Sequence, residues 1–253
     1  MSQVAVQTGT LIWSDLASPD LEASKKFYSG LFGWEVQTLG PDAGGYMMLT
    51  LGGKNVVGLG PQQNPQQPPA WLVYLATDDA DAIGQKVRDA GGQTLAEPFD
   101  VLNAGRMAIF QDLGGAVFGV WQPGQHRGAE LMNQPGTISW PELSTRDPEG
   151  AKRFYPRVFG WEIKDSDYGD STYTEWQIGG RSVAGMMPMS ESIPAQVPPH
   201  WLLYFAVQDC RQATQKVQEL GGRVLVETME YPGGTFAVAA DPQGATFGLM
   251  AGV

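Results

Sequence analysis

The sequence has little of several residues on which common functions depend. Its 253 residues include one cysteine, Cys210, and two histidines, His126 and His200. A single cysteine excludes an intramolecular disulfide and fits a reducing compartment, so we expect a cytoplasmic protein. There is no run of 18 apolar residues, and the first residues lack a basic segment followed by an apolar one. We therefore expect neither a membrane span nor a signal peptide.

Charge is also scarce, because only 17% of the residues are Asp, Glu, Lys or Arg. Lys and Arg number 16 against 27 acidic residues, which gives a net charge of -11. Both halves of the chain are acidic, so no basic patch is available to neutralise phosphates. Nucleic acid is therefore not an expected partner, and neither is an anionic membrane surface. What the sequence does have is 42% hydrophobic residues, including eight Trp, eight Tyr and ten Phe, enough for a packed core.

The most informative feature is an internal repeat. Residues 13–36 (WSDLASPDLEASKKFYSGLFGWEV) match residues 140–163 (WPELSTRDPEGAKRFYPRVFGWEI) at an offset of 127. Three further blocks match in the same order: 52–60 with 179–187, 68–79 with 198–209, and 112–121 with 241–250. Repeats of this length exceed solenoid units and indicate a duplicated globular domain. We expect a first domain at residues 1–124, a linker at 125–134 and a second domain at 135–253.

Each repeat divides again into two modules with the order β-α-β-β-β. In the first module a strand precedes Ser18-Pro19-Asp20, which opens a helix that ends at Gly33. Short strands separated by Gly, Asp and Asn follow, and the same order recurs after the Pro/Gln-rich stretch 61–69. The second repeat copies this pattern and ends its last helix near Leu220. We expect an α+β fold in which paired modules curl into a half-barrel sheet around a ligand-sized trough.

This arrangement resembles the vicinal oxygen chelate superfamily, which includes glyoxalase I, bleomycin-resistance proteins and extradiol dioxygenases. Three motifs carry the resemblance: the D-x-x-x-(A/S)-K-(K/R)-F-Y helix leading to Phe-Gly-Trp, the DDADA…AGG helix of the first repeat, and the closing D-x-x-G-A-x-F-G strand. The first and third occur in both repeats, and the second repeat has a helix ending in Leu-Gly-Gly in place of the second motif. The resemblance implies two tandem glyoxalase/bleomycin-resistance-like domains. Because the superfamily hosts lyases, isomerases, dioxygenases and pure binders, it leaves the function open.

Enzymes of that superfamily hold a divalent metal in the trough, with ligands at equivalent positions of the two modules. In this sequence the ligand positions fall on Trp13 and Trp140, on Leu72 and Leu202, and on Gly119 and Gly248. Indole, isobutyl and hydrogen side chains cannot coordinate a divalent ion. We therefore expect no metal at these positions and no cofactor.

The candidate catalytic residues are Asp15, Glu142 and His200. Strand alternation places Trp13 with Asp15, and Trp140 with Glu142, on one face of a strand. A carboxylate beside an indole in a partly dry trough could act as a general base, or it could pair with a neighbouring N–H group or cation while the Trp packs as core. His200 lies near an expected metal-ligand position and could bind a metal or act as a base, or it could be a rim histidine at the start of a strand.

Candidate ligand-binding residues are mostly aromatic side chains that recur in both repeats. A trough with aromatic walls and phenol hydroxyl groups suits a planar organic ligand, although the same residues could form ordinary barrel core. Arg106 occurs in the first repeat only and could hold a ligand carboxylate or lie on the surface. His126 is expected in a linker loop and Cys210 as a bystander thiol. The expected ligand-binding residues are Trp13, Trp140, Tyr46, Tyr173, Tyr74, Tyr204 and Arg106.

Three functions remain possible at this point. The leading hypothesis is a monomeric or homodimeric protein that binds a small hydrophobic or aromatic molecule in one or both troughs without the usual metal. The alternative is a lyase, isomerase or dioxygenase-like enzyme whose relocated site uses His200, Asp15 or Glu142. A scaffold that binds another protein is a third possibility.

Overall fold

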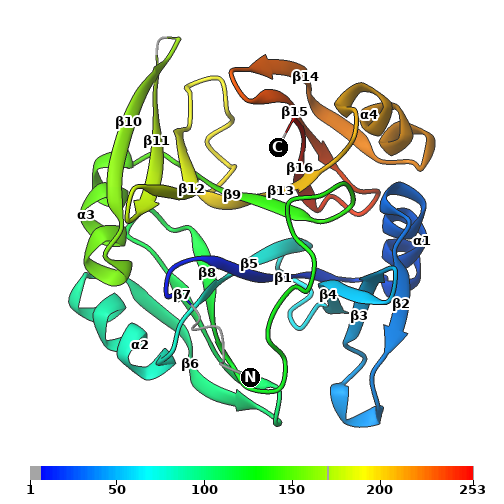
Figure 1. Cartoon of the computed structure of the whole chain (residues 1–253), viewed down its shortest axis with the longest axis horizontal. Helices are drawn as coiled ribbons and strands as arrows, with labels where there is room; N and C mark the ends of the chain where they lie inside the picture. Colours follow the sequence, from blue (N-terminus) through cyan, green and yellow to red (C-terminus); the bar gives the residue numbers. More distant parts are fainter. Residues whose placement is uncertain (1–6, 170, 253) are drawn as a thin grey trace. The chain divides into compact units, whose positions relative to one another are not determined.

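The computed structural model describes residues 7–169 and 171–252. In the first repeat the chain forms one sheet of eight strands in the order β2-β3-β4-β1-β5-β8-β7-β6. Figure 1 follows the elements along the chain. They are β1 (Leu11–Ser18), α1 (Leu21–Phe32), β2 (Glu35–Thr38), a 3-10 turn (Pro41–Ala43), β3 (Met47–Leu51), β4 (Lys54–Pro61), β5 (Ala70–Ala76), α2 (Ala80–Asp89), β6 (Gln93–Val101), β7 (Gly105–Gln111) and β8 (Val117–Pro123).

The second repeat forms a second eight-stranded sheet with the equivalent order, β10-β11-β12-β9-β13-β16-β15-β14. The expected α+β fold of four β-α-β-β-β modules in two curled sheets is thereby confirmed. No helix in the described residues is long and apolar enough to cross a membrane. The elements are β9 (Ile138–Thr145), α3 (Pro148–Phe159), β10 (Glu162–Tyr168), β11 (Ser171–Ile178), β12 (Arg181–Pro188), β13 (His200–Ala206), α4 (Cys210–Glu219), β14 (Arg223–Tyr231), β15 (Gly234–Ala240) and β16 (Thr246–Ala251).

The helices begin and end where the sequence predicts. Each begins after an aspartate whose side chain accepts a hydrogen bond from a backbone N–H group of the first turn: Asp20, Asp79, Asp147 and Asp209. Such N-caps satisfy donors that have no partner within the helix. Helices α1 and α3 end at Gly33 and Gly160, which adopt left-handed conformations with φ near 74° and 72°.

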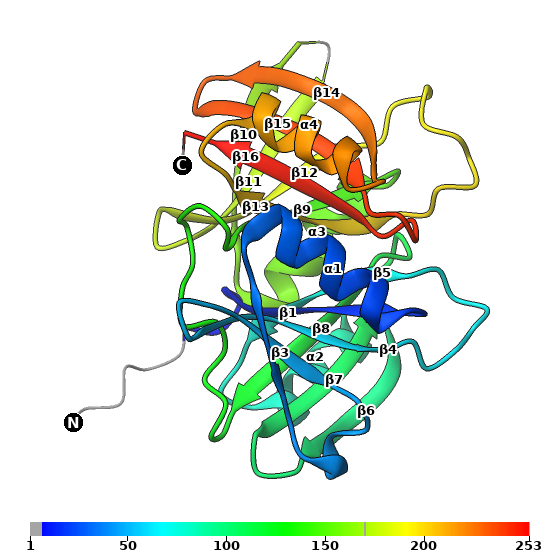
Figure 2. The same cartoon turned by 90° about the vertical axis from the view of Figure 1, so that its right-hand side faces the viewer.

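The modules group into two compact units, and this grouping differs from the order of the repeats. Among the described residues, one unit contains 7–12, 73–127 and 140–201, and the other contains 13–72, 128–139 and 202–252. Each unit thus combines one module from each repeat. Figure 1 shows α2 beside α3 in the first unit and α1 beside α4 in the second, and the latter pair faces the viewer in Figure 2. The expected domains 1–124 and 135–253 correspond to the sequence repeats and not to these units, and they remain a prediction.

A buried hydrogen-bonded chain lies between the two modules of the second unit. Trp71 Nε1 donates to Tyr28 Oη over 3.0 Å, and Tyr28 Oη donates to Asp241 Oδ2 over 3.1 Å. Asp241 is 1% exposed, and its other oxygen accepts three backbone N–H groups of its own turn. Phe205 and Phe247 contact the same aromatic cluster. Tyr28 belongs to the first repeat, but its hydrogen-bond acceptor and part of its aromatic packing come from the second.

The first unit contains the equivalent chain. Trp201 Nε1 donates to Tyr155 Oη over 3.0 Å, and Tyr155 Oη donates to Asp112 Oδ2 over 2.8 Å. Here the tyrosine comes from the second repeat and the aspartate from the first. Burial raises the pKa of both tyrosines well above the ordinary value, and the nearby carboxylates raise it further, so both phenols stay protonated.

We predict that neither repeat forms a stable monomeric fold alone. A fragment of residues 1–124 lacks Asp241, Phe205 and Phe247, which leaves the buried Tyr28 hydroxyl without its acceptor. Circular dichroism and size-exclusion chromatography of fragments 1–124 and 135–253, alone and mixed, test this expectation. We expect cooperative unfolding only for the mixture and the intact chain. A monomeric 1–124 fragment that unfolds cooperatively would contradict the prediction.

The buried aspartates should also make stability depend on pH. Burial raises the pKa of the Asp112 and Asp241 carboxyl groups, and hydrogen bonds from Tyr155 or Tyr28 and from backbone N–H groups lower it by less. The folded state then holds these protons more tightly than the unfolded state. The protonated carboxyl groups stabilise the folded state fully below the unfolded pKa of about 3.9, and this stabilisation is lost as pH rises through the folded pKa. The double variant Asp112→Asn/Asp241→Asn has no such protons to lose. Between these two pKa values its free energy of unfolding, measured in urea titrations, should therefore fall less with rising pH than that of wild type. A larger loss in the variant would contradict this sign.

Candidate functional site

The helix-free face of the β1–β4 module carries the first candidate cluster. Trp13 and Asp15 project from the same face of β1, as strand alternation predicts. Trp13 Nε1 donates to Tyr46 Oη over 3.0 Å, and Tyr46 Oη donates to Asp15 Oδ2 over 3.1 Å. Trp13 is 3% exposed, whereas Tyr46 and Asp15 are half-buried. The structure therefore brings three predicted site residues into one hydrogen-bonded chain.

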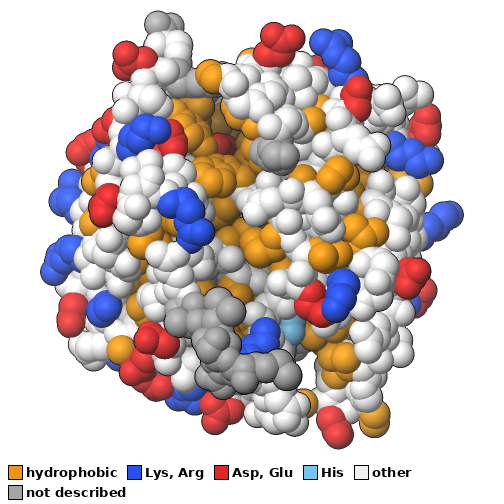
Figure 3. All heavy atoms as spheres, in the orientation of Figure 1, with side chains coloured by type: hydrophobic (Ala, Val, Ile, Leu, Met, Phe, Trp, Pro, Cys, Tyr) orange, Lys and Arg blue, Asp and Glu red, His pale blue; other side chains and the backbone are white. Residues whose placement is uncertain are grey.

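The helix-free face of the β9–β12 module repeats this cluster. Trp140 Nε1 donates to Tyr173 Oη over 3.0 Å, and Tyr173 Oη donates to Glu142 Oε2 over 3.0 Å. All three side chains are half-buried, including Trp140, which is more exposed than Trp13. In the space-filling view, hydrophobic side chains gather over β11 and β12 (Figure 3).

The two phenols in these clusters are held in the protonated form. Burial raises the pKa of Tyr46 well above the ordinary value, and the Asp15 carboxylate raises it further. Burial and then Glu142 raise the pKa of Tyr173 in the same way. Since each phenol oxygen accepts the indole N–H, its own proton points at the carboxylate. The phenol therefore orients the carboxylate and cannot act as a base near neutral pH.

Each of these tyrosines lies against a glycine on the adjacent strand. A Cβ at Gly58 would come within 3.0 Å of Tyr46, and a Cβ at Gly185 would do the same to Tyr173. The sequence did not lead us to predict that these tyrosines pack against glycines, or that Trp, Tyr and the carboxylate form a hydrogen-bonded chain. The available signal was a tyrosine followed by a glycine twelve residues later, Tyr46 to Gly58 and Tyr173 to Gly185, in both repeats.

The predicted residues Tyr74 and Tyr204 lie in a different environment. Each is 4% exposed and lies flat against a glycine, Gly119 or Gly248, on the neighbouring strand. A Cβ at Gly119 would be 2.4 Å from the Tyr74 ring, and a Cβ at Gly248 would be 2.2 Å from the Tyr204 ring. These phenol rings occupy the space that a longer side chain at the glycines would need. Tyr74 and Tyr204 offer little surface to a ligand.

The side chains at the expected metal-ligand positions lack the free donor atoms that a divalent ion needs. Trp13 already donates its indole N–H to Tyr46, Leu72 has no donor atom, and Gly119 is covered by Tyr74. The second repeat offers Trp140, Leu202 and Gly248 in the same places. In the part of the chain that the structure describes, no three His, Cys, Asp or Glu side chains converge as a metal site would require.

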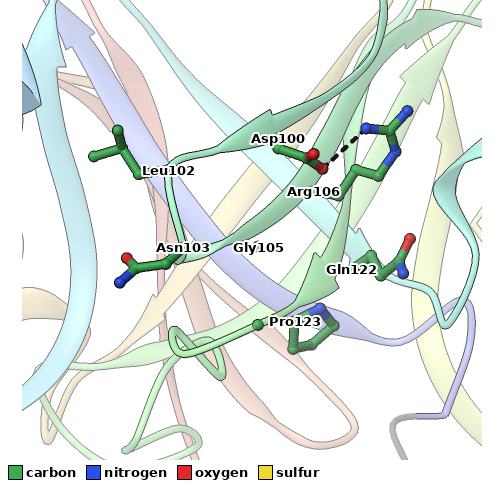
Figure 4. A pocket seen from close by; sticks show the side chains of 8 residues that line it. Asp100, Leu102, Asn103, Gly105, Arg106, Gln122 and Pro123 are labelled. Atoms are coloured by element: carbon green, nitrogen blue, oxygen red, sulfur yellow. Dashed lines mark hydrogen bonds and ion pairs between the residues drawn. The ribbon is translucent and has the colours of Figure 1, made fainter.

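Arg106 lies at a surface depression of about 240 Å³ near the β6–β7 turn. Its guanidinium group makes two hydrogen bonds to Asp81, of 2.8 and 3.0 Å, and one of 2.9 Å to Asp100. Figure 4 shows Arg106 beside Asp100, with Leu102 and Asn103 across the depression. The contacts raise the pKa of Arg106 and lower that of Asp81. Because two carboxylates already neutralise Arg106, few of its donors remain for a ligand carboxylate.

The remaining candidates lie apart from the two clusters. His200 is half-buried at the start of β13, with Nδ1 2.9 Å from the carbonyl oxygen of Pro198. His126 follows β8, and its ring contacts Trp121 edge-on. Cys210 begins α4, is 1% exposed and donates to the carbonyl of Thr235. Burial raises the pKa of the Cys210 thiol, which opposes activation as a nucleophile.

We predict that the two tryptophans of the clusters differ in their contribution to stability. Trp13 is nearly fully buried, so Trp13→Ala should cost about 3–5 kcal/mol of unfolding free energy. Trp140 is half-buried, so Trp140→Ala should cost less. Urea unfolding of both variants, with Trp13→Phe and Trp140→Phe as shape-matched controls, measures the difference. Equal losses would show that both indoles are core.

Comparisons with known proteins agree with the fold. The family model for the Glyoxalase/Bleomycin resistance protein/Dioxygenase superfamily matches residues 10–120 and 137–249. Anthracycline biosynthesis protein DnrV of Streptomyces peucetius is 40% identical over 96% of this chain and 93% of its own. Putative glyoxylase CFP32 of Mycobacterium bovis is 40% identical over 96% of this chain and 94% of its own.

Solved structures show the same architecture at low sequence identity. The Mn(II)-bound glyoxalase of Novosphingobium aromaticivorans aligns with a TM-score of 0.70 and 17% identity, covering 98% of this chain and 83% of that one. The 2,2',3-trihydroxybiphenyl 1,2-dioxygenase of Sphingomonas wittichii aligns with a TM-score of 0.68 and 15% identity, covering 97% and 91%. With a matched family domain in each repeat, this chain belongs to the glyoxalase/bleomycin resistance protein/dioxygenase superfamily.

Proposed function

We propose that the protein binds a small, flat aromatic molecule on the helix-free faces of the β1–β4 and β9–β12 modules. The single observation that carries the proposal is the Trp–Tyr–carboxylate chain, present in both repeats with its carboxylate half-buried. A half-buried carboxylate with a fixed orientation accepts a hydrogen bond from a ligand hydroxyl or amine group. Tyr46 on the first face, and Trp140 and Tyr173 on the second, are half-buried aromatic side chains on which a flat ligand can stack.

The side chains at the metal positions support binding without a resident metal. In this proposal the ligand is held by the carboxylate and by apolar contact alone. The negative charge of each cluster and the net charge of -11 disfavour an anionic ligand, so the ligand is neutral or cationic. The name of the Streptomyces peucetius relative links that protein to anthracyclines, which are fused-ring aromatic compounds of this general shape.

We predict that removing either carboxylate weakens binding of a hydroxylated aromatic probe such as 2-naphthol. A lost hydrogen bond to a charged acceptor should reduce affinity at that face by about tenfold or more. Isothermal titration of wild type, Asp15→Asn and Glu142→Gln measures the effect. The exposed Glu191→Gln is the control for loss of one negative charge and should bind as wild type does.

Two results would contradict the proposal. If 2-naphthol binds with wild-type affinity to Asp15→Asn/Glu142→Gln, the ligand is held elsewhere. Mass spectrometry and NMR spectroscopy of the probe after the titration separate binding from catalysis, because an isomerised product keeps its mass but changes its spectrum. A probe recovered chemically changed from wild type but unchanged from the double variant would favour the alternative, an enzyme with its site at these carboxylates.

A further inference from the structure

The two proposed binding faces differ along one row of side chains that crosses four strands. In the β1–β4 module, strand register aligns Asp15 with Gly58, Gly58 with Met48, and Met48 with Gln37. We call these four residues row 1. In antiparallel and parallel sheets alike, residues aligned in this way lie on the same face. Row 1 therefore extends from the carboxylate of the first cluster across the helix-free face.

The β9–β12 module contains the equivalent row. Its register aligns Glu142 with Gly185, Gly185 with Glu175, and Glu175 with Lys164. We call these four residues row 2. Every member of row 2 follows its counterpart in row 1 by 127 positions, so the rows can be compared residue by residue. Both rows contain a carboxylate and a glycine at equivalent positions. Met48 of row 1 is replaced by Glu175 in row 2, and Gln37 is replaced by Lys164.

Glu175 is fixed in place by a polar network. Lys164 Nζ lies 2.9 Å from Glu175 Oε1, Ser182 Oγ donates to Glu175 Oε2, and Gln177 Nε2 donates to Ser182 Oγ over 3.1 Å. The hydrogen bond from Ser182 and the contact with Lys164 lower the pKa of Glu175, so it stays ionised and only accepts hydrogen bonds. Its side chain is 24% exposed. Glu175 lies two residues after Tyr173 on β11, so both side chains are on the same face of the strand. Its charge also contributes to raising the pKa of Tyr173.

Row 1 has no such second acceptor at the equivalent position. Met48 is half-buried and presents a flexible, apolar thioether. On the first face an apolar surface therefore follows the carboxylate of Asp15. On the second face the Tyr173 hydroxyl covers Gly185. A ligand that lies on Tyr173 therefore meets one carboxylate on each side, Glu142 and Glu175. Since neighbouring strands are about 4.8 Å apart, the backbones of β9 and β11 are separated by about 10 Å.

We propose that Met48 and Glu175 determine which ligands the two faces accept. The face with row 1 takes a flat aromatic molecule with one hydrogen-bond donor and an otherwise apolar body. The face with row 2 takes a fused-ring molecule that carries donors, hydroxyl or amine, at both ends. This inference rests on the proposed function, because it assumes that ligands bind at Asp15 and Glu142.

The test uses two probes and isolates one face at a time in the full-length chain. The probes are 2-naphthol, with one donor, and 2,6-dihydroxynaphthalene, with donors at opposite ends. Asp15→Asn weakens binding at the first face, so the tighter binding that isothermal titration then measures belongs to row 2. Glu142→Gln weakens binding at the second face in the same way and leaves row 1 to be measured.

In the Asp15→Asn background, Glu175→Met should weaken the diol by about tenfold and leave 2-naphthol within about twofold. Lys164→Met should strengthen the diol, because Glu175 then keeps its full charge for the ligand. In the Glu142→Gln background, Met48→Glu should raise the affinity for the diol relative to 2-naphthol. Glu175→Gln serves as the variant that keeps the side-chain shape, and thermal melting confirms that each variant is folded.

The outcomes separate the inference from the function on which it rests. If Glu175→Met and Lys164→Met weaken both probes alike, the polar network only supports the fold and the inference is wrong. If Asp15→Asn and Glu142→Gln weaken binding but no row variant changes the ratio of the two affinities, the proposed function stands and the inference fails. If neither probe binds to wild type, both fail.

Discussion

The hydrogen bond between a buried tyrosine of one repeat and a buried aspartate of the other is the contact on which the two units depend. Tyr28 reaches Asp241, and Tyr155 reaches Asp112. Each aspartate uses one oxygen for the tyrosine and the other for backbone N–H groups of its own turn. Because a buried carboxylate without partners is very unfavourable, the helix and the turn must meet for either to be stable. A duplicated sequence is thereby tied into units that each need both copies.

The same arrangement of three groups, indole to phenol to carboxylate, occurs on both faces of the sheets. Beside the helices it appears as Trp71–Tyr28–Asp241 and Trp201–Tyr155–Asp112, and on the helix-free faces as Trp13–Tyr46–Asp15 and Trp140–Tyr173–Glu142. The indole–phenol distance is 3.0 Å in all four. The four chains differ in the burial of their carboxylate residues. Asp112 and Asp241 are 4% and 1% exposed, whereas Asp15 and Glu142 are half-buried. An inaccessible carboxylate can only support the fold, so we place ligand binding at the accessible pair.

Much of this fold follows from local patterns in the sequence. Aspartate caps, glycine stops and alternating strands specify the modules, and alternation alone places Trp13 with Asp15. The grouping of modules into units does not follow, because the repeats are similar enough that Tyr28 could meet either Asp112 or Asp241. Arg106 illustrates a different limit. Asp81, which is 25 residues away in the sequence, meets it through the packing of α2 against β7. Asp100, which is 6 residues away, meets it as its cross-strand partner in the β6–β7 hairpin.

The two helix-free faces have the same framework but have diverged in detail. Tyr46 lies against Gly60 as well as Gly58, whereas the position equivalent to Gly60 in the second repeat is Met187. Trp13 is nearly inaccessible, and its counterpart Trp140 is half-buried. If both faces existed only to stabilise the sheets, the interior packing would need to be retained and the accessible positions could vary without pattern. Here the tyrosine and the carboxylate are retained at half-buried positions, whereas Met48 and Gln37 are replaced by Glu175 and Lys164 in the neighbouring row. We interpret this distribution as the divergence of two related sites, in line with the proposed binding of different ligands.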